Sequence, residues 1–309
     1  MKFVGAFAFV GLLATFCTPH ASAKSIDIDF TRVISIEETE RYWRRLPAEM
    51  QYLRSVEEPP RRITNGQLAA TAQFPYQAVV YSDAGDGYYS LCGGSILTKN
   101  YILTAAHCVT DDLDQTAPGG IVILGATDRT VVQSTQQRMT FSKAGIRVHP
   151  QYNSVSIRND IATVRLDTPA VFNAYVNVID LPALSDARQF GGVEGTASGF
   201  GRTTDTSAPS SVLMFVRNPV MTNAQCNLYW STSSVEAQNV CLDPTGGRSA
   251  CNGDSGGPLT VQDAGRSLQV GIASFVSARG CTSGAPSVWV RVSYFRDWIR
   301  QNSDYVFRA

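Results

Sequence analysis

Downstream of position 62 the sequence alternates between short apolar runs and clusters of Gly, Asp, Asn, Ser and Pro. The runs are four to eight residues long and rich in Val, Ile, Leu, Tyr and Thr, which favours β-strands over helices. Short strands at this spacing predict an all-β barrel or sandwich, and these 247 residues would fill two modest barrels better than one. The expected strands are Gln77–Tyr81, Leu91–Leu97, Tyr101–Thr104, Gly120–Leu124, Ile161–Leu166, Leu268–Phe275 and Val288–Val292.

One helix is expected near the C-terminal end, where apolar residues recur at helical spacing among charged ones. The apolar positions are Tyr294, Phe295, Trp298 and Ile299. This amphipathic pattern is typical of a helix that packs one face against the protein. We therefore expect a packing helix rather than a membrane-binding one.

The first 23 residues follow another pattern. Lys2 precedes the apolar run Phe3–Cys17, and the small residues Ala21–Ala23 follow that run. Fifteen apolar residues fall short of the roughly 20 that span a bilayer, so a signal peptide is favoured over a membrane anchor. We expect residues 1–23 to direct secretion to an extracellular location, with no membrane association of the mature chain.

Residues 24–62 are unusually charged, with eight basic and eight acidic side chains among 39 positions. The segment ends in Glu57–Arg62, whose two prolines favour an extended, accessible chain. Such a segment is either a surface linker or an activation propeptide that a protease removes. It contains no cysteine, so a released propeptide would be expected to diffuse away.

The overall composition excludes several classes of function. The chain has 26 Lys+Arg against 26 Asp+Glu and a pI near 6.8, so it lacks the basic field that nucleic-acid binding needs. A hydrophobic content of 44% with 17% charged residues is typical of a packed globular protein. Six cysteines follow the signal segment, and an even set in a secreted chain suggests disulfides, although six thiols allow 15 pairings.

Two short strings carry the candidate chemistry. The region after position 62 has only two histidines; His149 lies in an apparent surface loop, whereas His107 follows a strand in the string Leu103–Cys108. The string Cys251–Pro258 places three glycines around Ser255, which lets a substrate carbonyl approach backbone N–H groups. Taken singly, the histidine could be structural and the serine could lie in an ordinary turn.

Together the two strings resemble the chymotrypsin-like secreted serine proteases, and the resemblance extends from Ile63 to about Ser303. Phe275 and Gly280–Cys281 are similar to the brachyurin-like subset of invertebrate chymotrypsin, elastase and collagenase types. The resemblance implies two antiparallel six-stranded β-barrels packed together with a C-terminal helix. Residues 63–309 would form the protease domain, with the two halves meeting near 180–190.

The resemblance also implies a catalytic triad. The family places its aspartate in an Asn-Asp-Ile-Ala string, which stands here at Asn159–Ala162 and makes Asp160 the third member with His107 and Ser255. The backbone N–H groups of Gly253 and Ser255 would form the oxyanion hole. A triad of this kind needs no metal or organic cofactor, and none is expected. The calcium loop of some relatives is expected to be absent, because Asp128 is the only carboxylate between positions 120 and 139.

The same match implies a zymogen. Cleavage after Arg62 would free the amine of Ile63, and that ammonium would pair with Asp254 and order the oxyanion hole. The disulfide pairing that the resemblance implies is Cys92–Cys108, Cys226–Cys241 and Cys251–Cys281.

By the family pattern Ser249 forms the base of the pocket that takes the residue before the scissile bond, and a neutral base disfavours Arg or Lys. Val276 and Ser287 stand where an open pocket would have glycines, so the slot should be short and select small or medium apolar residues, as in elastase. The expected pocket residues are Ser249, Ser274, Phe275, Val276 and Ser287. Such a pocket would not accept Arg62, so a separate trypsin-like protease is expected to activate the chain.

The expected function is therefore a monomeric digestive endopeptidase of the gut lumen that cleaves proteins and peptides and can meet protein protease inhibitors. One alternative is a protease-shaped binding protein without activity, although all three triad positions are intact. Another is a regulatory or host-directed secreted protease.

Overall fold

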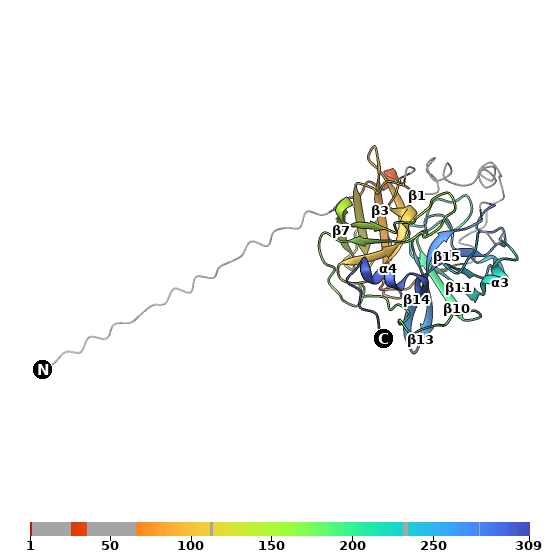
Figure 1. Ribbon diagram of the computed structural model, residues 1–309. Helices are drawn as coiled ribbons and strands as arrows, with labels where there is room; N and C mark the ends of the chain where they lie inside the picture. Colours follow the sequence, from red (N-terminus) through yellow and green to blue (C-terminus); the bar gives the residue numbers. More distant parts are fainter. Residues whose placement is uncertain (2–25, 36–65, 112–113, 231–233, 278) are drawn as a thin grey trace.

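The computed structural model describes Met1 and residues 26–35, 66–111, 114–230, 234–277 and 279–309, and they form two barrel-like sheets with few helices (Figure 1). The first sheet runs in the order β7-β6-β3-β4-β5-β9-β8 with antiparallel pairing. The end strands of this path, β7 and β8, follow each other in the sequence and are connected by the 3-10 turn η5 (Lys143–Gly145). Its strands are β3 (Gln77–Gly85), β4 (Tyr88–Ile96), β5 (Tyr101–Thr104), β6 (Gly119–Leu124), β7 (Gln137–Ser142), β8 (Ile146–Val148) and β9 (Ala162–Arg165).

The second sheet runs β10-β13-β14-β15-β12-β11 and closes through antiparallel pairing of β10 with β11. A short strand, β2 (Gln67–Leu68), adds to the outer edge of β11. The barrel strands are β10 (Glu194–Gly199), β11 (Met214–Met221), β12 (Asn239–Leu242), β13 (Pro258–Asp263), β14 (Arg266–Phe275) and β15 (Ser287–Arg291). The expectation of two antiparallel barrels is thus confirmed.

Each barrel has its own apolar core, and a third cluster joins the two. Leu124 lies in the first core and Leu259 in the second, both fully buried. Burying such a side chain contributes roughly 1.5–3 kcal/mol relative to leaving it in water. The third cluster contains Tyr81 of β3 together with Phe215 of β11, so buried apolar side chains of both barrels belong to one cluster.

The helices are short. The C-terminal α4 (Arg296–Gln301) buries Ile299 in the core of the first barrel, although the chain reaches it from the second. α3 (Asn223–Cys226) begins with a capping box in which Thr222 and Gln225 satisfy each other's backbone N–H groups. Single 3-10 turns are η4 (Ala106–Cys108), η6 (Thr245–Gly247) and η7 (Val292–Tyr294). Within the described ranges, the chain forms no helix with the length and apolar character of a membrane span.

All seven expected strands have counterparts in the structure, with ends shifted by a few residues. Six further barrel strands among the described residues were not expected: β7, β8, β10, β11, β12 and β13. In β10, Gly195 and Gly199 stand where branched residues would mark a strand, and in β11, Pro219 usually argues against one. Cross-strand partners decide both cases, since every residue of β10 pairs with one of β11.

One segment upstream of the barrels is also ordered against them. After the 3-10 turn η1 (Phe30–Arg32), β1 (Val33–Ser35) pairs in parallel with β4 (Figure 1). Ile28, just before the turn, is only 4% exposed and belongs to the cluster that joins the barrels. Residues 26–35 therefore contribute to the packed body, which composition did not suggest.

Candidate active site

Three separate segments bring His107, Asp160 and Ser255 to the junction of the barrels. His107 lies in η4 directly after β5, and Asp160 precedes β9. Because β5 and β9 are antiparallel neighbours that pair Thr104 with Ala162, the two side chains start from adjacent strand ends. Ser255 comes from the second barrel, in the loop before β13, and its carbonyl oxygen lies 3.4 Å from the Sγ atom of Cys108.

Asp160 is a buried hydrogen-bond acceptor at the centre of this group. Its Oδ2 atom lies 2.8 Å from His107 Nδ1, and its Oδ1 atom accepts the backbone N–H of His107 at 3.0 Å. The Ser274 hydroxyl donates to Oδ2 at 2.6 Å. These contacts fix the plane of the imidazole and direct its Nδ1 atom toward the acid, so Nε2 is the ring nitrogen that faces away from the acid and suits proton transfer.

Burial alone would raise the pKa of the Asp160 carboxyl, because an ionised group loses its hydration there. Attraction to His107 and hydrogen bonds from His107 and Ser274 outweigh burial, and they hold the pKa of Asp160 below its ordinary value of 3.8. The site therefore keeps an ionised carboxylate beside the imidazole at neutral pH.

The loop that carries Ser255 is fixed by backbone hydrogen bonds from both barrels. Gly93 N–H of β4 donates to the Ser255 carbonyl at 2.7 Å, and Gly256 N–H donates to the carbonyl of Ala273 at 2.8 Å. Gly256 has a φ of 79°, and a Cβ atom there would meet Thr104 Oγ1 at 2.2 Å. Glycine at this position therefore lets the serine loop approach the first barrel.

Asp254 is held just below the serine. Its Oδ1 accepts Gly201 N–H at 2.8 Å, and its Oδ2 accepts Cys251 N–H at 2.9 Å. A Cβ atom on Gly199 or Gly201 would meet this carboxylate at 2.1 Å or 2.5 Å, so the cradle requires glycine at both positions. The expected partners in activation, Arg62 and Ile63, lie outside the described residues.

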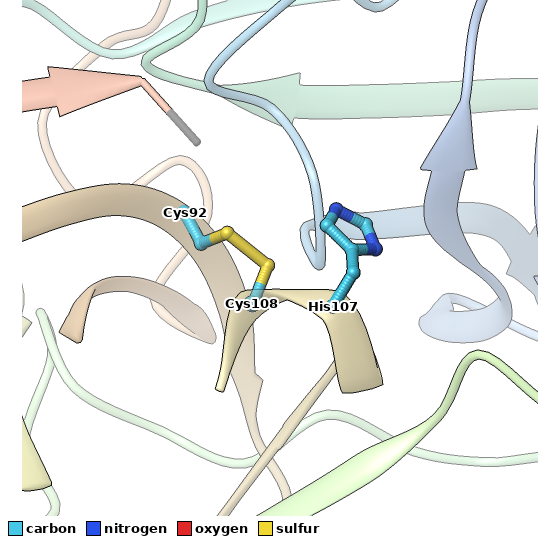
Figure 2. Close-up of side chains that lie close together, drawn as sticks. All are labelled: Cys92, His107 and Cys108. Carbon is cyan, nitrogen blue, oxygen red and sulfur yellow. A yellow bond between two sulfur atoms is a disulfide. The ribbon is translucent and has the colours of Figure 1, made fainter. Parts of the chain in front are cut away.

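Three disulfides brace the site: Cys92–Cys108, Cys226–Cys241 and Cys251–Cys281. These are the pairs that the resemblance implies. Figure 2 shows the first beside His107, whose ring points away from the sulfurs. A disulfide that closes a loop of 15 to 30 residues contributes about 2–4 kcal/mol to stability.

Two groups of potential metal ligands occur among the described residues, and both consist mainly of these sulfurs. One is Cys92, His107 and Cys108, which Figure 2 draws; the other combines Asp205 with Cys251 and Cys281. A sulfur in a disulfide is not a thiolate and is a poor metal ligand. Both groups are therefore explained by the disulfides.

A pocket enclosing about 290 Å³, part of it open to solvent, begins at Ser255 and extends into the second barrel. Four of the five expected pocket residues line it, namely Ser274, Phe275, Val276 and Ser287. The fifth, Ser249, lines a neighbouring cavity of about 220 Å³ instead and donates its hydroxyl to the Ala250 carbonyl at 2.8 Å.

Trp289 explains this difference, and the sequence pattern did not identify it. It is buried, lines both cavities and thus forms part of the wall between them. Its indole N–H donates to Ser287 Oγ at 3.0 Å, which fixes that hydroxyl. The consecutive apolar residues Val288–Val290 indicate a buried strand, but they do not reveal which cavity the indole borders.

Trp230 and Asp205 support the pocket walls from outside, and no sequence signal pointed to either. The Trp230 ring packs edge-on against Phe275 at 5.2 Å between centroids, and its N–H donates to the carbonyl of Pro286 at 3.0 Å. Asp205 accepts the backbone N–H of Cys281 at 2.6 Å. These contacts tie both pocket walls to the body of the second barrel.

The other histidine after position 62 has a packing role. His149 lies 5.4 Å from Phe295 and 5.5 Å from Trp298, between ring centroids, and burial lowers its pKa. It therefore packs beside α4 rather than lying free in a surface loop.

Comparison with known proteins decides the family: the model of the family Trypsin matches residues 63–299. The chain belongs to the trypsin family. Brachyurin of Leptuca pugilator is 38% identical over 240 residues, which cover 77% of this chain and 97% of that protein. Chymotrypsin of Phaedon cochleariae is 34% identical over 249 residues, covering 80% of this chain and 84% of that one. The solved structure of HL collagenase matches with a TM-score of 0.69 and 31% identity over 79% of this chain and 99% of its own.

This trypsin-family chain is accordingly a chymotrypsin-like serine endopeptidase of the invertebrate type, and its substrates are proteins. The resemblance seen in the sequence is confirmed at the level of family and fold.

The depressed pKa of Asp160 makes stability depend on pH with a definite sign. Because the native pKa lies below that of the unfolded chain, the carboxylate stabilises the fold above about pH 4, and this contribution disappears as the pH falls through the native pKa. In Asp160→Asn the melting temperature should fall less steeply than in the parent between roughly pH 6 and pH 3. Thermal unfolding at intervals of pH measures both slopes.

Asp297→Asn, the same chemical change on the exposed side of α4, is the matched control for the loss of one carboxyl. Equal slopes for Asp160→Asn and the parent would contradict the stabilising role of the buried carboxylate.

Proposed function

We propose that the protein is a secreted digestive endopeptidase, made as a zymogen, that cleaves after small or medium apolar residues with His107, Asp160 and Ser255. The observation that carries the catalytic part is the buried Asp160 carboxylate, which orients His107 beside the loop of Ser255. Membership of the trypsin family supports protein substrates. Similarity to invertebrate relatives such as brachyurin supports an extracellular site of action, which we take to be the gut lumen.

In the first half of the proposed mechanism, Ser255 Oγ attacks the scissile carbonyl while His107 Nε2 removes the hydroxyl proton. Asp160 stabilises the imidazolium that forms and keeps its ring in place. The tetrahedral oxyanion binds the backbone N–H groups of Gly253 and Ser255; loss of one such donor costs about 3–4 kcal/mol of transition-state stabilisation. His107 then returns the proton to the leaving amine, and the carbon–nitrogen bond breaks to give an acyl-enzyme.

In the second half, water attacks the acyl group and His107 takes a proton from that water. The tetrahedral intermediate collapses with return of the proton to Ser255 Oγ, which releases the new carboxyl terminus. No redox partner is consumed, and this chain's own side chains supply each proton transfer.

Selectivity follows from the pocket beside Ser255. Its one charged lining residue within the described ranges is Asp254, and backbone N–H groups of Gly201 and Cys251 already bind that carboxylate. An Arg or Lys side chain would thus enter without a dedicated counter-ion, which is costly. The side chains of Val276 and Ser287 and the indole of Trp289 take up space, which favours short apolar side chains.

Activation is the remaining part of the proposal. Cleavage after Arg62 by a trypsin-like protease would free the Ile63 amine to pair with Asp254, whose carboxylate is already held below Ser255. A buried pair of this kind would link the new terminus to the backbone of Gly253 and Ser255. The neutral pocket supports an external activator, because it does not suit Arg62.

The first prediction from the proposed function concerns activity before and after cleavage at Arg62. The uncut proenzyme should be nearly inactive, and brief trypsin treatment followed by trypsin removal should yield an enzyme that prefers Ala, Val or Leu before the scissile bond. The measurement is kcat/KM on peptides that differ only at that residue. Ser255→Ala should lower kcat on the order of 10⁶-fold.

Cleavage that survives in Ser255→Ala would show that another residue or a contaminant acts. Absence of cleavage by the treated parent would favour the protease-shaped binding protein instead.

The second prediction tests the length of the pocket. Val276→Gly should raise the ratio of kcat/KM for Phe over Ala by about tenfold or more, because a few carbons in an apolar pocket are worth about 1–3 kcal/mol. Val132→Gly, which shortens an 80% exposed side chain, is the control and should leave the ratio unchanged. An unchanged ratio in Val276→Gly would remove Val276 from the specificity pocket.

The third prediction tests the activation pair. Ile63→Gln should be cut at position 62 yet stay nearly inactive, because its polar side chain resists burial beside Asp254. Ile63→Val, which keeps an apolar branched side chain, should retain most of the activity. Intact mass confirms the cut and kcat/KM reports activity; full activity in cut Ile63→Gln would contradict the mechanism of activation.

A further inference from the structure

Residues 26–35 occupy an edge of the first barrel that its own strands leave open. β5 pairs with β4 only at Ser95 and Ile96, so the earlier half of β4 has an unpaired edge on that side. β1 fills this edge in parallel register, and the partners are Val33 with Tyr89, Ile34 with Ser90 and Ser35 with Leu91. An open strand edge is a natural site for an added strand.

Side-chain anchors accompany the strand pairing. Ile28 is 4% exposed within the cluster that joins the barrels, and the Phe30 ring lies edge-on to Tyr81 at 6.1 Å between centroids. Arg138 Nη1 donates to the Ile26 carbonyl at 3.2 Å, and Ser35 is completely buried at the other end. The segment therefore has its own binding surface over its whole length.

The filled edge lies next to the proposed active site. Leu91, the partner of Ser35, precedes Cys92 of the disulfide beside His107, and Figure 2 shows β1 on the same side as that disulfide. A Cβ atom on Gly253 would lie 3.6 Å from Leu91 Cδ2. Two residues further along β4, Gly93 bonds the carbonyl of Ser255.

The direction of a bound substrate follows from the position of the pocket. The side chain before the scissile bond enters a pocket built by the second barrel, on one side of Ser255. On its other side Ser255 is bordered by the first barrel, because its carbonyl oxygen lies 3.4 Å from Cys108 Sγ. We take substrate residues after the scissile bond to leave along this side, past the Cys92–Cys108 disulfide and the edge of β4. That edge is the one that β1 covers.

We propose that residues 26–35 stay bound along β4 after cleavage at Arg62, as a non-covalent second chain, and partly cover the surface for substrate residues that follow the scissile bond, so that the cut enzyme cleaves proteins more slowly than it would without this segment. The inference rests on the proposed function for the cut and the reaction. The contacts that the structure describes for this segment are made with β4, Tyr81 and Arg138, and none of these depends on the peptide bond after Arg62. The propeptide has no cysteine that could link it to the protease, and this had suggested that it diffuses away. Strand pairing and buried apolar side chains would hold it in place of a disulfide.

The binding test uses the full proenzyme with Ser255→Ala, so that no self-digestion occurs, and with residues 58–62 replaced by an enteropeptidase recognition sequence. After enteropeptidase treatment, size-exclusion chromatography and intact mass should find the released propeptide eluting with the protease chain. The double variant Ile28→Ala/Phe30→Ala should lose the peptide. Thr31→Ser, which removes one methyl group from an exposed position of the same segment, should retain it.

Separate elution of the parent propeptide at micromolar protein concentration would overturn the proposal. Co-elution of the propeptide with the protease chain does not depend on catalysis. The chromatography therefore decides whether the propeptide stays bound even if the proposed reaction is wrong.

The second test uses the active chain with the same enteropeptidase site and two substrates that share the residues before the scissile bond. One ends there in a chromogenic amide, and the other continues for four residues. The Ile28→Ala/Phe30→Ala enzyme should cleave the longer substrate with at least tenfold higher kcat/KM than the parent, and the short one equally well. A synthetic peptide of residues 26–35 added to that variant should inhibit cleavage of the longer substrate only.

Equal rates of parent and variant on the longer substrate would show that β1 does not cover this surface. Loss of cleavage of both substrates by every form would instead contradict the proposed endopeptidase reaction, while the elution result would still stand.

Discussion

The Asp160 carboxylate, ionised and shielded from water, is the constraint around which the junction of the two barrels is organised. A buried charge is tolerated only when hydrogen bonds replace its hydration. His107 supplies two of these bonds from the first barrel and Ser274 supplies one from the second. The relative position of the barrels therefore matters for this charge, because displacing the second barrel would remove the Ser274 hydroxyl from the carboxylate and leave it with the two His107 donors alone.

Backbone hydrogen bonds also fix the position of Ser255 relative to both barrels. The loop around Ser255 is held between Gly93 of β4 and Ala273 of β14, and its glycines allow contacts closer than any side chain would permit. Its position is thus set by hydrogen bonds from both barrels before any substrate arrives. Groups placed in advance need little reorganisation during the reaction, which is the main advantage of a rigid site.

Much of this could be read from the sequence. The apolar runs predicted seven of the barrel strands, and the strings around His107, Asp160 and Ser255 located the candidate site by family likeness. Spatial relations were less accessible. Ser249 lines a cavity that shares Trp289 with the pocket, and β10 is a strand because β11 and β13 pair with it. The docking of residues 26–35 was hidden for the same reason, since an open strand edge is a property of the assembled sheet and not of local composition.

Ser274 belongs both to the catalytic group around Asp160 and to the pocket, and this limits how the substrate range of such an enzyme can evolve. Its hydroxyl bonds the buried acid while the same residue lines the pocket. A substitution of Ser274 that reshapes the pocket also changes the hydrogen bond to Asp160. Substrate range and turnover are therefore expected to change together at this position. Val276 lines the pocket without such a bond among the described contacts, so a substitution there can change the substrate range without altering the hydrogen bonds of Asp160.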